Sequence, residues 1–324
     1  MSFKDLKVEH IEGELAVALS KWYPFHKRNF IKIGEKKCLL PYKYIENSDS
    51  LYNFKIRPDD TWIITHPRSG TTITRELVWL VANNMNFDEA RRKYLLERVP
   101  FIEYRAIYDD HLVTKDVPGR INTDKNSLDF VQNQPSPRFI TSHLPFNLLP
   151  TVVNSTCKII YVARNPRDVV VSWYHFHKEM PRYSYPGTFE QFCDNFMNNH
   201  TIWSPYWEHV KEAWMMRHRE NMMFFFYEDL IKDLPSNIKK VITFFDKTYS
   251  NEQITKLVEH LNIENFRKNP MVNQPISDIV IKSNAFIRQG TTGGWKQMFT
   301  PEIEEKFNKW ITDNLRDTDL AFPS

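Results

Sequence analysis

The sequence is poor in the features that stabilise secreted domains or anchor a chain in a membrane. It has three cysteines in 324 residues, Cys38, Cys157 and Cys193, whose odd number and wide spacing suit a reducing compartment and offer no metal site. No run approaches the roughly 20 apolar residues that a membrane-spanning helix needs. Residues 1–30 alternate charge with short apolar pieces, unlike a secretory leader. We therefore expect a soluble, cytoplasmic protein that binds neither a metal nor a membrane.

Charge of one sign is also scarce. The chain has 43 basic and 40 acidic residues, a formal net charge of +3, with no long block of either sign. A general nucleic-acid surface is therefore not expected. Apolar residues make up 41% of the chain, enough for one large α/β domain or two small ones. The aromatic content of 14% indicates either a bulky core or a pocket for flat apolar molecules.

Glycine is scarce as well, with only eight in the chain. One of these glycines lies in Thr61 to Leu80, the segment around which the chain is organised. An apolar run typical of a buried strand, 62–65, is followed by the apolar spacing of a helix. The loop between them, Pro67 to Thr72, combines Arg68, Gly70 and two threonines. Backbone amides at a helix start beside an arginine suit an anionic group, although a plain turn capped by a threonine is the alternative. The G-x-x-x-x-G-K-[ST] pattern is absent, so an ordinary ATP or GTP site is disfavoured.

Further strands and helices alternate along the chain, which predicts a parallel sheet with helices on both faces. We expect an N-terminal arm over 1–57, packed on a main domain over 58–324, with a substrate lid at 101–137 because long connections are usually functional. Ligands of such sheets bind beyond the carboxyl ends of the strands. The predicted strands are 62–65, 138–142, 158–163 and 222–226, and the predicted helices are 12–19, 73–81, 87–98, 169–178, 208–218, 236–245, 251–260 and 301–314.

Four separated segments resemble those of the cytosolic sulfotransferases, which use 3'-phosphoadenosine 5'-phosphosulfate (PAPS). They are HPRSGTT at 66–72, HLP at 143–145, YVARNPRDVVVSWYHF at 161–176 and IRQGTTGGWK at 287–296, and they occur in the family's order. The resemblance spans about residues 60–310. It implies a single-domain α/β fold, a P-loop-like 5'-phosphosulfate loop, and sulfonation of small molecules in metabolism or detoxification.

The resemblance also implies where PAPS binds. A dianionic 3'-phosphate is well held by a forked guanidinium and a hydroxyl, as Arg164 and Ser172 would provide. In the glycine-rich segment three of the eight glycines fall within five residues, which marks close backbone approach or, on the plain interpretation, only a loop. The implied cofactor-binding residues are Arg68, Ser69, Gly70, Thr71, Thr72, Ile73, Arg164, Ser172, Tyr227, Ile263, Ile287, Arg288, Gln289 and Gly290.

His143 is the candidate general base, although a lone histidine is more often structural. Its neutral imidazole, with an unperturbed pKa near ~6.5, can accept the proton of a hydroxyl. The resemblance implies that Arg68 and Ser172 also act in catalysis, with Arg68 and the loop threonines neutralising charge on the departing 5'-phosphate. The acceptor would be a phenol, sterol or other apolar alcohol in a pocket lined by Phe101, Tyr104, His143 and Phe176.

Several positions depart from the family pattern. Arg68 and Thr141 replace lysines, and Arg68 cannot serve as a proton donor. Ile73 replaces the tryptophan that stacks on adenine, and Ile263 ends a segment, HLNI, that replaces H-T-S-F. The aromatic contribution of roughly 1 to 3 kcal/mol per base is thereby weakened. Pro301 removes a backbone donor from a segment that resembles the family's dimerisation segment, which argues against a homodimer through it.

Two other functions remain open. A sulfotransferase-like protein could hold a lipophilic ligand or a nucleotide without turnover, as the missing lysines and stacking aromatics suggest. A P-loop kinase of small molecules is the other alternative, but the missing lysine and the arginines of the 3'-phosphate site argue against it.

Overall fold

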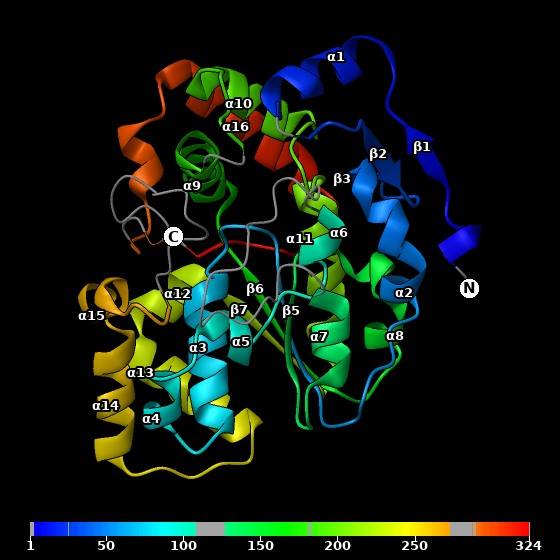
Figure 1. Ribbon diagram of the computed structural model, residues 1–324. Coiled ribbons are helices and arrows are strands. Elements are labelled where there is room, and N and C mark those ends of the chain that lie inside the picture. Colours follow the sequence, from blue (N-terminus) through cyan, green and yellow to red (C-terminus); the bar gives the residue numbers. More distant parts are fainter. Residues whose placement is uncertain are drawn as a thin grey trace.

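A computed structural model describes residues 3–24, 26–107, 127–180, 183–272, 287 and 290–323. Its centre is a four-stranded, wholly parallel sheet in the order β5-β4-β6-β7, which confirms the predicted fold class. The strands are Phe139–Ser142, Thr61–Thr65, Lys158–Ala163 and Met222–Phe226, respectively. Helices lie on both sides of this sheet (Figure 1).

Alternate residues of the strands bury two separate cores. Ile63, Ile160 and Val162 face one apolar cluster, whereas Ile64 and Tyr161 face the other. The first cluster is covered by α3 (Thr71–Ala82), α13 (Leu234–Phe244) and α14 (Asn251–Leu261). The second is covered by α9 (Pro166–Glu179), α10 (Phe189–Met197), α11 (Tyr206–Met216) and α16 (Pro301–Leu315). Burial on both faces explains why these strands are continuous apolar runs.

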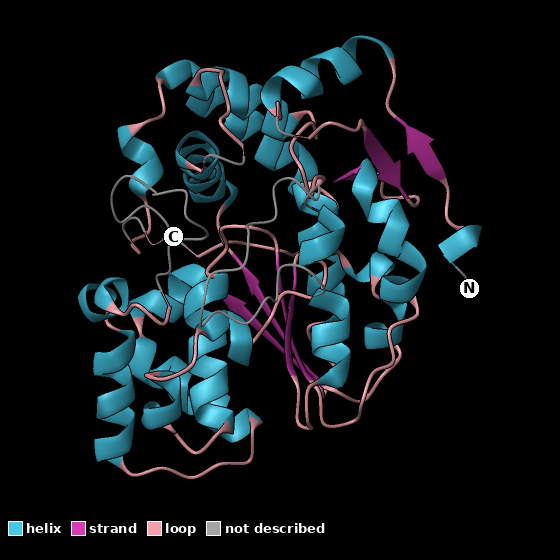
Figure 2. Cartoon of the chain, viewed as in Figure 1, coloured by secondary structure: helices cyan, strands magenta, loops and turns pink. Residues whose placement is uncertain are grey.

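The N-terminal segment holds strands that the sequence analysis did not predict. A three-stranded antiparallel sheet is formed by β1 (Val8–His10), β2 (Phe30–Ile33) and β3 (Cys38–Pro41), and it lies apart from the parallel sheet (Figure 2). Helix α1 (Gly13–Trp22) is longer than the predicted 12–19. Leu39 exchanges backbone hydrogen bonds with Trp203 and Ser204, of 2.9 and 2.8 Å. The short strands therefore complete their hydrogen bonding against a distant segment, which local sequence does not reveal.

The predicted helix at 87–98 is wrong, because the segment forms two short helices. Helix α4 ends at Ala90, and α5 (Leu95–Arg98) begins after Tyr94, whose backbone is extended. The amide of Leu95 donates to the carbonyl of Met271, at 2.8 Å, instead of continuing a helical ladder. A tertiary hydrogen bond thus interrupts the helix.

The remaining elements are short connections. Helices α6 and α7 flank residues 108–126 of the predicted lid, which lie outside the described residues. No helix among the described ranges is long and apolar enough to cross a membrane. The bounds are α2 (Ser48–Tyr52), α4 (Phe87–Ala90), α6 (Tyr104–Ile107), α7 (Ser127–Asn133), α8 (Pro150–Val153), α12 (Tyr227–Lys232) and α15 (Ile263–Lys268), with 3-10 turns at Phe3–Asp5, Tyr42–Asn47, Phe146–Leu148 and Gly294–Gln297.

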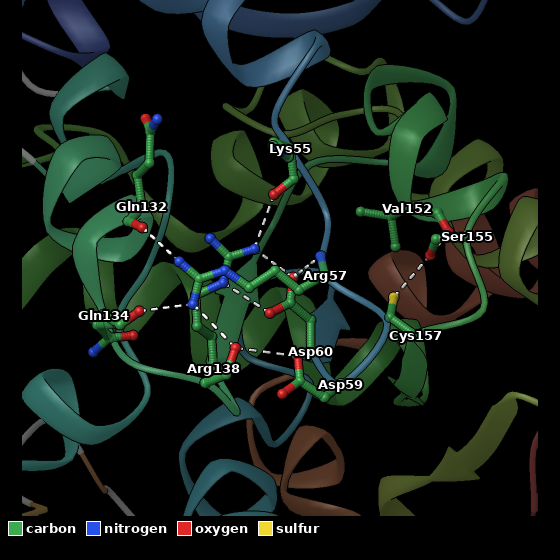
Figure 3. A network of polar contacts seen from close by, with 11 residues as sticks. Lys55, Arg57, Asp59, Asp60, Gln132, Gln134, Arg138, Val152, Ser155 and Cys157 are labelled. Carbon is green, nitrogen blue, oxygen red and sulfur yellow. Dashed lines mark hydrogen bonds and ion pairs between the residues drawn. The ribbon is translucent and has the colours of Figure 1, made fainter.

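A buried ion pair joins the amino ends of the two strands β4 and β5 (Figure 3). The Nε of Arg138 donates to Asp60 Oδ1 at 2.7 Å, and its Nη2 donates to Oδ2 of the same carboxylate. Both side chains are almost wholly buried. The amide of Arg57 also donates to Asp60, at 2.8 Å, so the carboxylate accepts several hydrogen bonds. This network holds the sheet at the edge opposite the carboxyl ends of its strands.

We expect Asp60→Asn to destabilise the fold by about 3–5 kcal/mol, because it leaves the buried charge of Arg138 without its partner. The free energy of unfolding in urea measures this. Asp59→Asn is the matched control, since Asp59 is the exposed neighbour and accepts only a 3.3 Å hydrogen bond from Ser136. Equal stabilities of the two variants would show that the pair does not hold the sheet edge.

Candidate active site

A cavity of about 560 Å³ opens where the parallel strands end. The loops after β4, β5, β6 and β7 all contribute to it. Arg288 and Gln289 lie outside the described residues, and Ser69 is buried without lining the cavity. The other predicted site residues line it together: Arg68, Gly70, Thr71, Thr72, Ile73, Phe101, Tyr104, His143, Arg164, Ser172, Phe176, Tyr227, Ile263, Ile287 and Gly290.

The loop between β4 and α3 has the geometry of an anion site. Gly70 has a φ of 101° and lies directly before the first residue of α3. A β-carbon there would lie 2.4 Å from the ring of Tyr227, so only glycine fits. The Oγ of Ser69 is buried without a hydrogen-bond partner. Amides at the start of α3 can therefore serve a negatively charged group, whereas the hydroxyl of Ser69 lies beneath the cavity surface.

Arg68 connects this loop with helix α9. Its Nε donates to Ser172 Oγ at 3.0 Å, and its guanidinium lies 4.9 Å from the ring centroid of Phe176. Its φ of 68° is unusual for a residue with a β-carbon. The left-handed backbone and the contacts with α9 aim this cation into the cavity.

Arg164, after β6, also lines the cavity and contacts the loop that carries Arg68. Its guanidinium stacks over Tyr227 at 4.4 Å and donates to the carbonyl oxygens of Arg68 and Thr291, at 3.2 and 2.9 Å. Its Nε is buried without a partner. Glu228, which the sequence analysis missed, holds the arginine loop by accepting the amide of Asn165 at 2.9 Å.

The glycine-rich segment is docked on α9 by Asp168, also missed from the sequence. The carboxylate of Asp168 accepts the amides of Gly293 and Trp295, at 2.8 and 3.2 Å. Gly290 has a φ of 65°, and a β-carbon on it would lie 2.2 Å from Ile263 Cδ1. Glycine is thus required where this segment approaches the residue expected beside adenine. Asp168 could have been identified from the sequence as an acidic residue in the first turn of the helix that follows Arg164.

His143 is held as a neutral base. Its Nδ1 lies 2.7 Å from the carbonyl oxygen of Thr65, which can only accept, so Nδ1 carries the proton and Nε2 the lone pair. Burial lowers the pKa of His143 to about 3, an effect that outweighs the hydrogen bond to Thr65. The rings of Phe101 and Trp203 pack against the imidazole at 4.8 and 5.5 Å. The imidazole is therefore uncharged at neutral pH and able to accept a proton.

Two buried charged residues near His143 were not identified as site residues from the sequence. Glu103 accepts the backbone amide of His143 at 2.6 Å, and burial raises the pKa of this carboxyl to about 7. Arg75, on α3, also lines the cavity. The apolar wall at this end includes Phe101, Tyr104, Ile107, Trp173, Phe176, Tyr183 and Trp203.

The two ends of the cavity suit different chemistry. The end beside α3, Arg164 and the glycine-rich segment offers cations, backbone amides and unpaired donors, which fit the phosphates of PAPS. The end beside His143 is largely apolar and carries one proton acceptor, which fits a hydroxyl on an apolar molecule. No group of three metal-ligating side chains occurs among the residues with described positions.

Comparisons with known proteins identify the family of this chain. The model of the sulfotransferase domain matches residues 58–319. The chain is 34% identical to sulfotransferase 1 family member D1 of Mus musculus over 283 residues, 86% of this chain and 91% of that protein.

Two solved structures of retinol dehydratase are also similar over their full lengths. The complex with retinol and PAP has a TM-score of 0.90 at 33% identity and covers 100% of both chains. The complex with androsterone and PAP, described there as an inactive cofactor, has a TM-score of 0.89 at 34% identity and covers 100% of this chain and 99% of that one. With the family model covering most of the chain, this protein belongs to the sulfotransferase family and is a PAPS-dependent sulfotransferase.

Proposed function

We propose that this enzyme sulfonates the hydroxyl of an apolar alcohol with a large, flat body, and that His143 is the general base. The observation that carries the proposal is the hydrogen bond from His143 Nδ1 to Thr65, which leaves Nε2 as the proton acceptor. Bound PAPS supplies the sulfuryl group, whose bond to the 5'-phosphate oxygen breaks as a bond to the acceptor oxygen forms. His143 Nε2 takes the hydroxyl proton.

The charged loops have the complementary role. Arg68, Thr71 and Thr72 lie where they would stabilise negative charge on the 5'-phosphate as it departs. Ser172, bonded to Arg68, would lie near the transferred group, and Arg164 would hold the 3'-phosphate. Ile73, Tyr227 and Ile263 would surround adenine. The resemblance implies that Arg288 and the amides that follow it would also bind the 3'-phosphate. Positioning and electrostatics would provide most of the catalysis.

The apolar end of the cavity supports the choice of acceptor. Phe101, Tyr104 and Phe176 line it, and Phe176 stacks on Trp173 with ring centroids 5.4 Å apart. Aromatic walls favour flat apolar molecules. The structures of retinol dehydratase hold retinol and androsterone, both apolar alcohols. We place sterols and extended apolar alcohols ahead of small phenols.

A second candidate is a protein that holds the same ligands with little or no turnover. Ile73 and Ile263 support it, because neither can stack on adenine as an aromatic ring would. Against it stands His143, whose tautomer leaves Nε2 as a proton acceptor. A cytoplasmic location and the absence of a dimer through Lys296–Glu305 remain predictions; Pro301 is the first residue of α16 there, with Thr300 as its cap.

We expect the native chain to transfer labelled sulfate from PAPS to members of a panel of phenols, sterols and extended apolar alcohols. His143→Ala should lower kcat/KM by about 10²–10⁴-fold, because it removes the proton acceptor. His10→Ala is the control, since His10 is exposed on β1. If His143→Ala transfers labelled sulfate as fast as the native chain, His143 is not the general base. Binding of PAPS without labelling of any acceptor would favour the second candidate.

Ile73→Trp should tighten binding of PAP by up to roughly 3 kcal/mol, because it adds a stacking surface for adenine. Ile73 is only partly buried and lines the cavity, so a larger side chain has room. Equilibrium titration with PAP measures the change. Val17→Trp, at an exposed apolar position on α1, controls for nonspecific binding to a new indole. An unchanged dissociation constant for Ile73→Trp would place adenine elsewhere.

A further inference from the structure

The acceptor end of the cavity lacks a cation that related enzymes have. Thr141 stands where the resemblance places a lysine, two residues before His143. In the structure Thr141 is completely buried, and its Oγ1 has no hydrogen-bond partner. It pairs with Ile63 of β4 and shares a strand face with Phe139. Both neighbours pack in the cluster covered by α3, so the side chain of Thr141 points toward that helix.

Arg75 lies on the part of α3 that faces this position. It follows Thr71 by four residues, so both are on one face of the helix, and helical side chains lean toward the N-terminus. Thr71 bonds Thr65 at 2.7 Å, and Thr65 bonds His143. Arg75 is therefore one turn behind the residues that hold the base.

The guanidinium of Arg75 lies against the aromatic ring that packs on His143. Its Cζ is 4.8 Å from the ring centroid of Phe101, which is itself 4.8 Å from the imidazole centroid. Phe101 forms a parallel bridge with Thr141, and the amide of Thr141 donates to the carbonyl of Pro100 at 2.8 Å. Arg75 and Thr141 thus both lie beside Phe101, although only Arg75 lines the cavity itself.

Arg75 is only partly satisfied by the protein. Its Nη2 donates to the carbonyl oxygens of Leu95 and Val99, but its Nε is buried without a partner. The side chain is 3% exposed and lines the cavity. The carbonyl partners therefore leave part of the guanidinium without a hydrogen-bond acceptor, and the positive charge of this cavity-lining residue can act on an anionic ligand.

The nearby carboxylates offset this positive charge only in part, although Glu76 opposes the effect of burial and raises the pKa of Arg75. Glu76 is bonded to Arg98 at 2.7 Å and to His260 at 2.8 Å. Glu103 lies in the same wall, but burial raises the pKa of its carboxyl to about 7, which reduces its negative charge at neutral pH. Burial lowers the pKa of Arg75 to about 9, which leaves the guanidinium protonated at pH 7.

We propose that Arg75 supplies from α3 the positive charge that a lysine at position 141 supplies in related enzymes, and that this charge acts on the sulfuryl oxygens during transfer. The inference rests on the proposed function, because it concerns the same transfer. On this inference the positive charge has moved from position 141 to position 75 and has not been lost from the site. A purely structural role, in which Arg75 only binds the carbonyl oxygens at the two ends of α5, is the competing explanation.

The test is a charge relocation in the full chain, with Arg75→Gln, Arg75→Lys and the double variant Arg75→Gln/Thr141→Lys. Dissociation constants for PAPS and PAP are measured by titration beside kcat/KM, since only PAPS carries the sulfuryl group. Arg75→Gln should lower kcat/KM by about 10²–10³-fold, as loss of one donor to developing negative charge does. It should raise the dissociation constant for PAPS by roughly tenfold, the size of a lost charge-assisted hydrogen bond, and change the dissociation constant for PAP little. Arg75→Lys should retain much of the activity, and Thr141→Lys should restore it in the double variant.

Other results would overturn the inference. If Arg75→Gln weakens the binding of PAPS and of PAP equally, or if the double variant does not recover activity, the role of Arg75 is structural. Arg91→Gln, which removes an exposed positive charge on the turn after α4, is the control for net charge. If the native chain transfers sulfate and Arg75→Gln does so equally well, only this inference fails. If the native chain neither binds PAPS nor transfers sulfate, the proposed function fails and this inference with it.

Discussion

The hydrogen bond from His143 Nδ1 to the carbonyl oxygen of Thr65 is the contact on which the site depends. It joins the ends of two neighbouring strands and determines which imidazole nitrogen is the base. The hydroxyl of Thr65 also contacts Thr71, the first residue of α3. One residue at the end of β4 therefore places the proton acceptor and the anion-binding loop relative to each other. The apolar packing of Phe101 and Trp203 keeps the base neutral.

The fold uses its buried charges in two different ways. Arg138 with Asp60, and Arg98 with Glu76, are matched pairs whose partners offset the cost of leaving water. Arg75 and Arg164 each keep a buried Nε without a protein acceptor, and both line the cavity. Unpaired donors at this edge of the sheet are what an anionic ligand requires. The matched pairs satisfy both of their charges inside the protein, whereas within the described part of the chain Arg75 and Arg164 have carbonyl oxygens and no carboxylate as their hydrogen-bond acceptors.

The sequence analysis was most successful where apolar pattern and motif coincide. The strands β6 and β7 have the bounds predicted from their apolar runs, because burial on both faces leaves one strong signal. The helix predicted at 87–98 failed because the amide of Leu95 bonds to a residue far along the chain. Strands β1 to β3 were missed because they pair with one another and with residues near position 203, and no motif marks their segment. The anchors Asp168 and Glu228 bond backbone amides across the fold, which spacing cannot reveal.

The sequence by itself determined the fold class, the family and the charged loops that line the cavity, because a strand, a glycine-containing loop and a helix start encode an anion site locally. It also showed that lysines and stacking aromatics had been replaced. Only the tertiary structure decided what accompanies those replacements. In the sequence Arg75 looks like an ordinary charged residue of an amphipathic helix. Its position over Phe101 depends on how α3 packs against the sheet. Burial, tautomer and unpaired donors arise from contacts between distant segments, so the electrostatics of the site exist only in the folded chain.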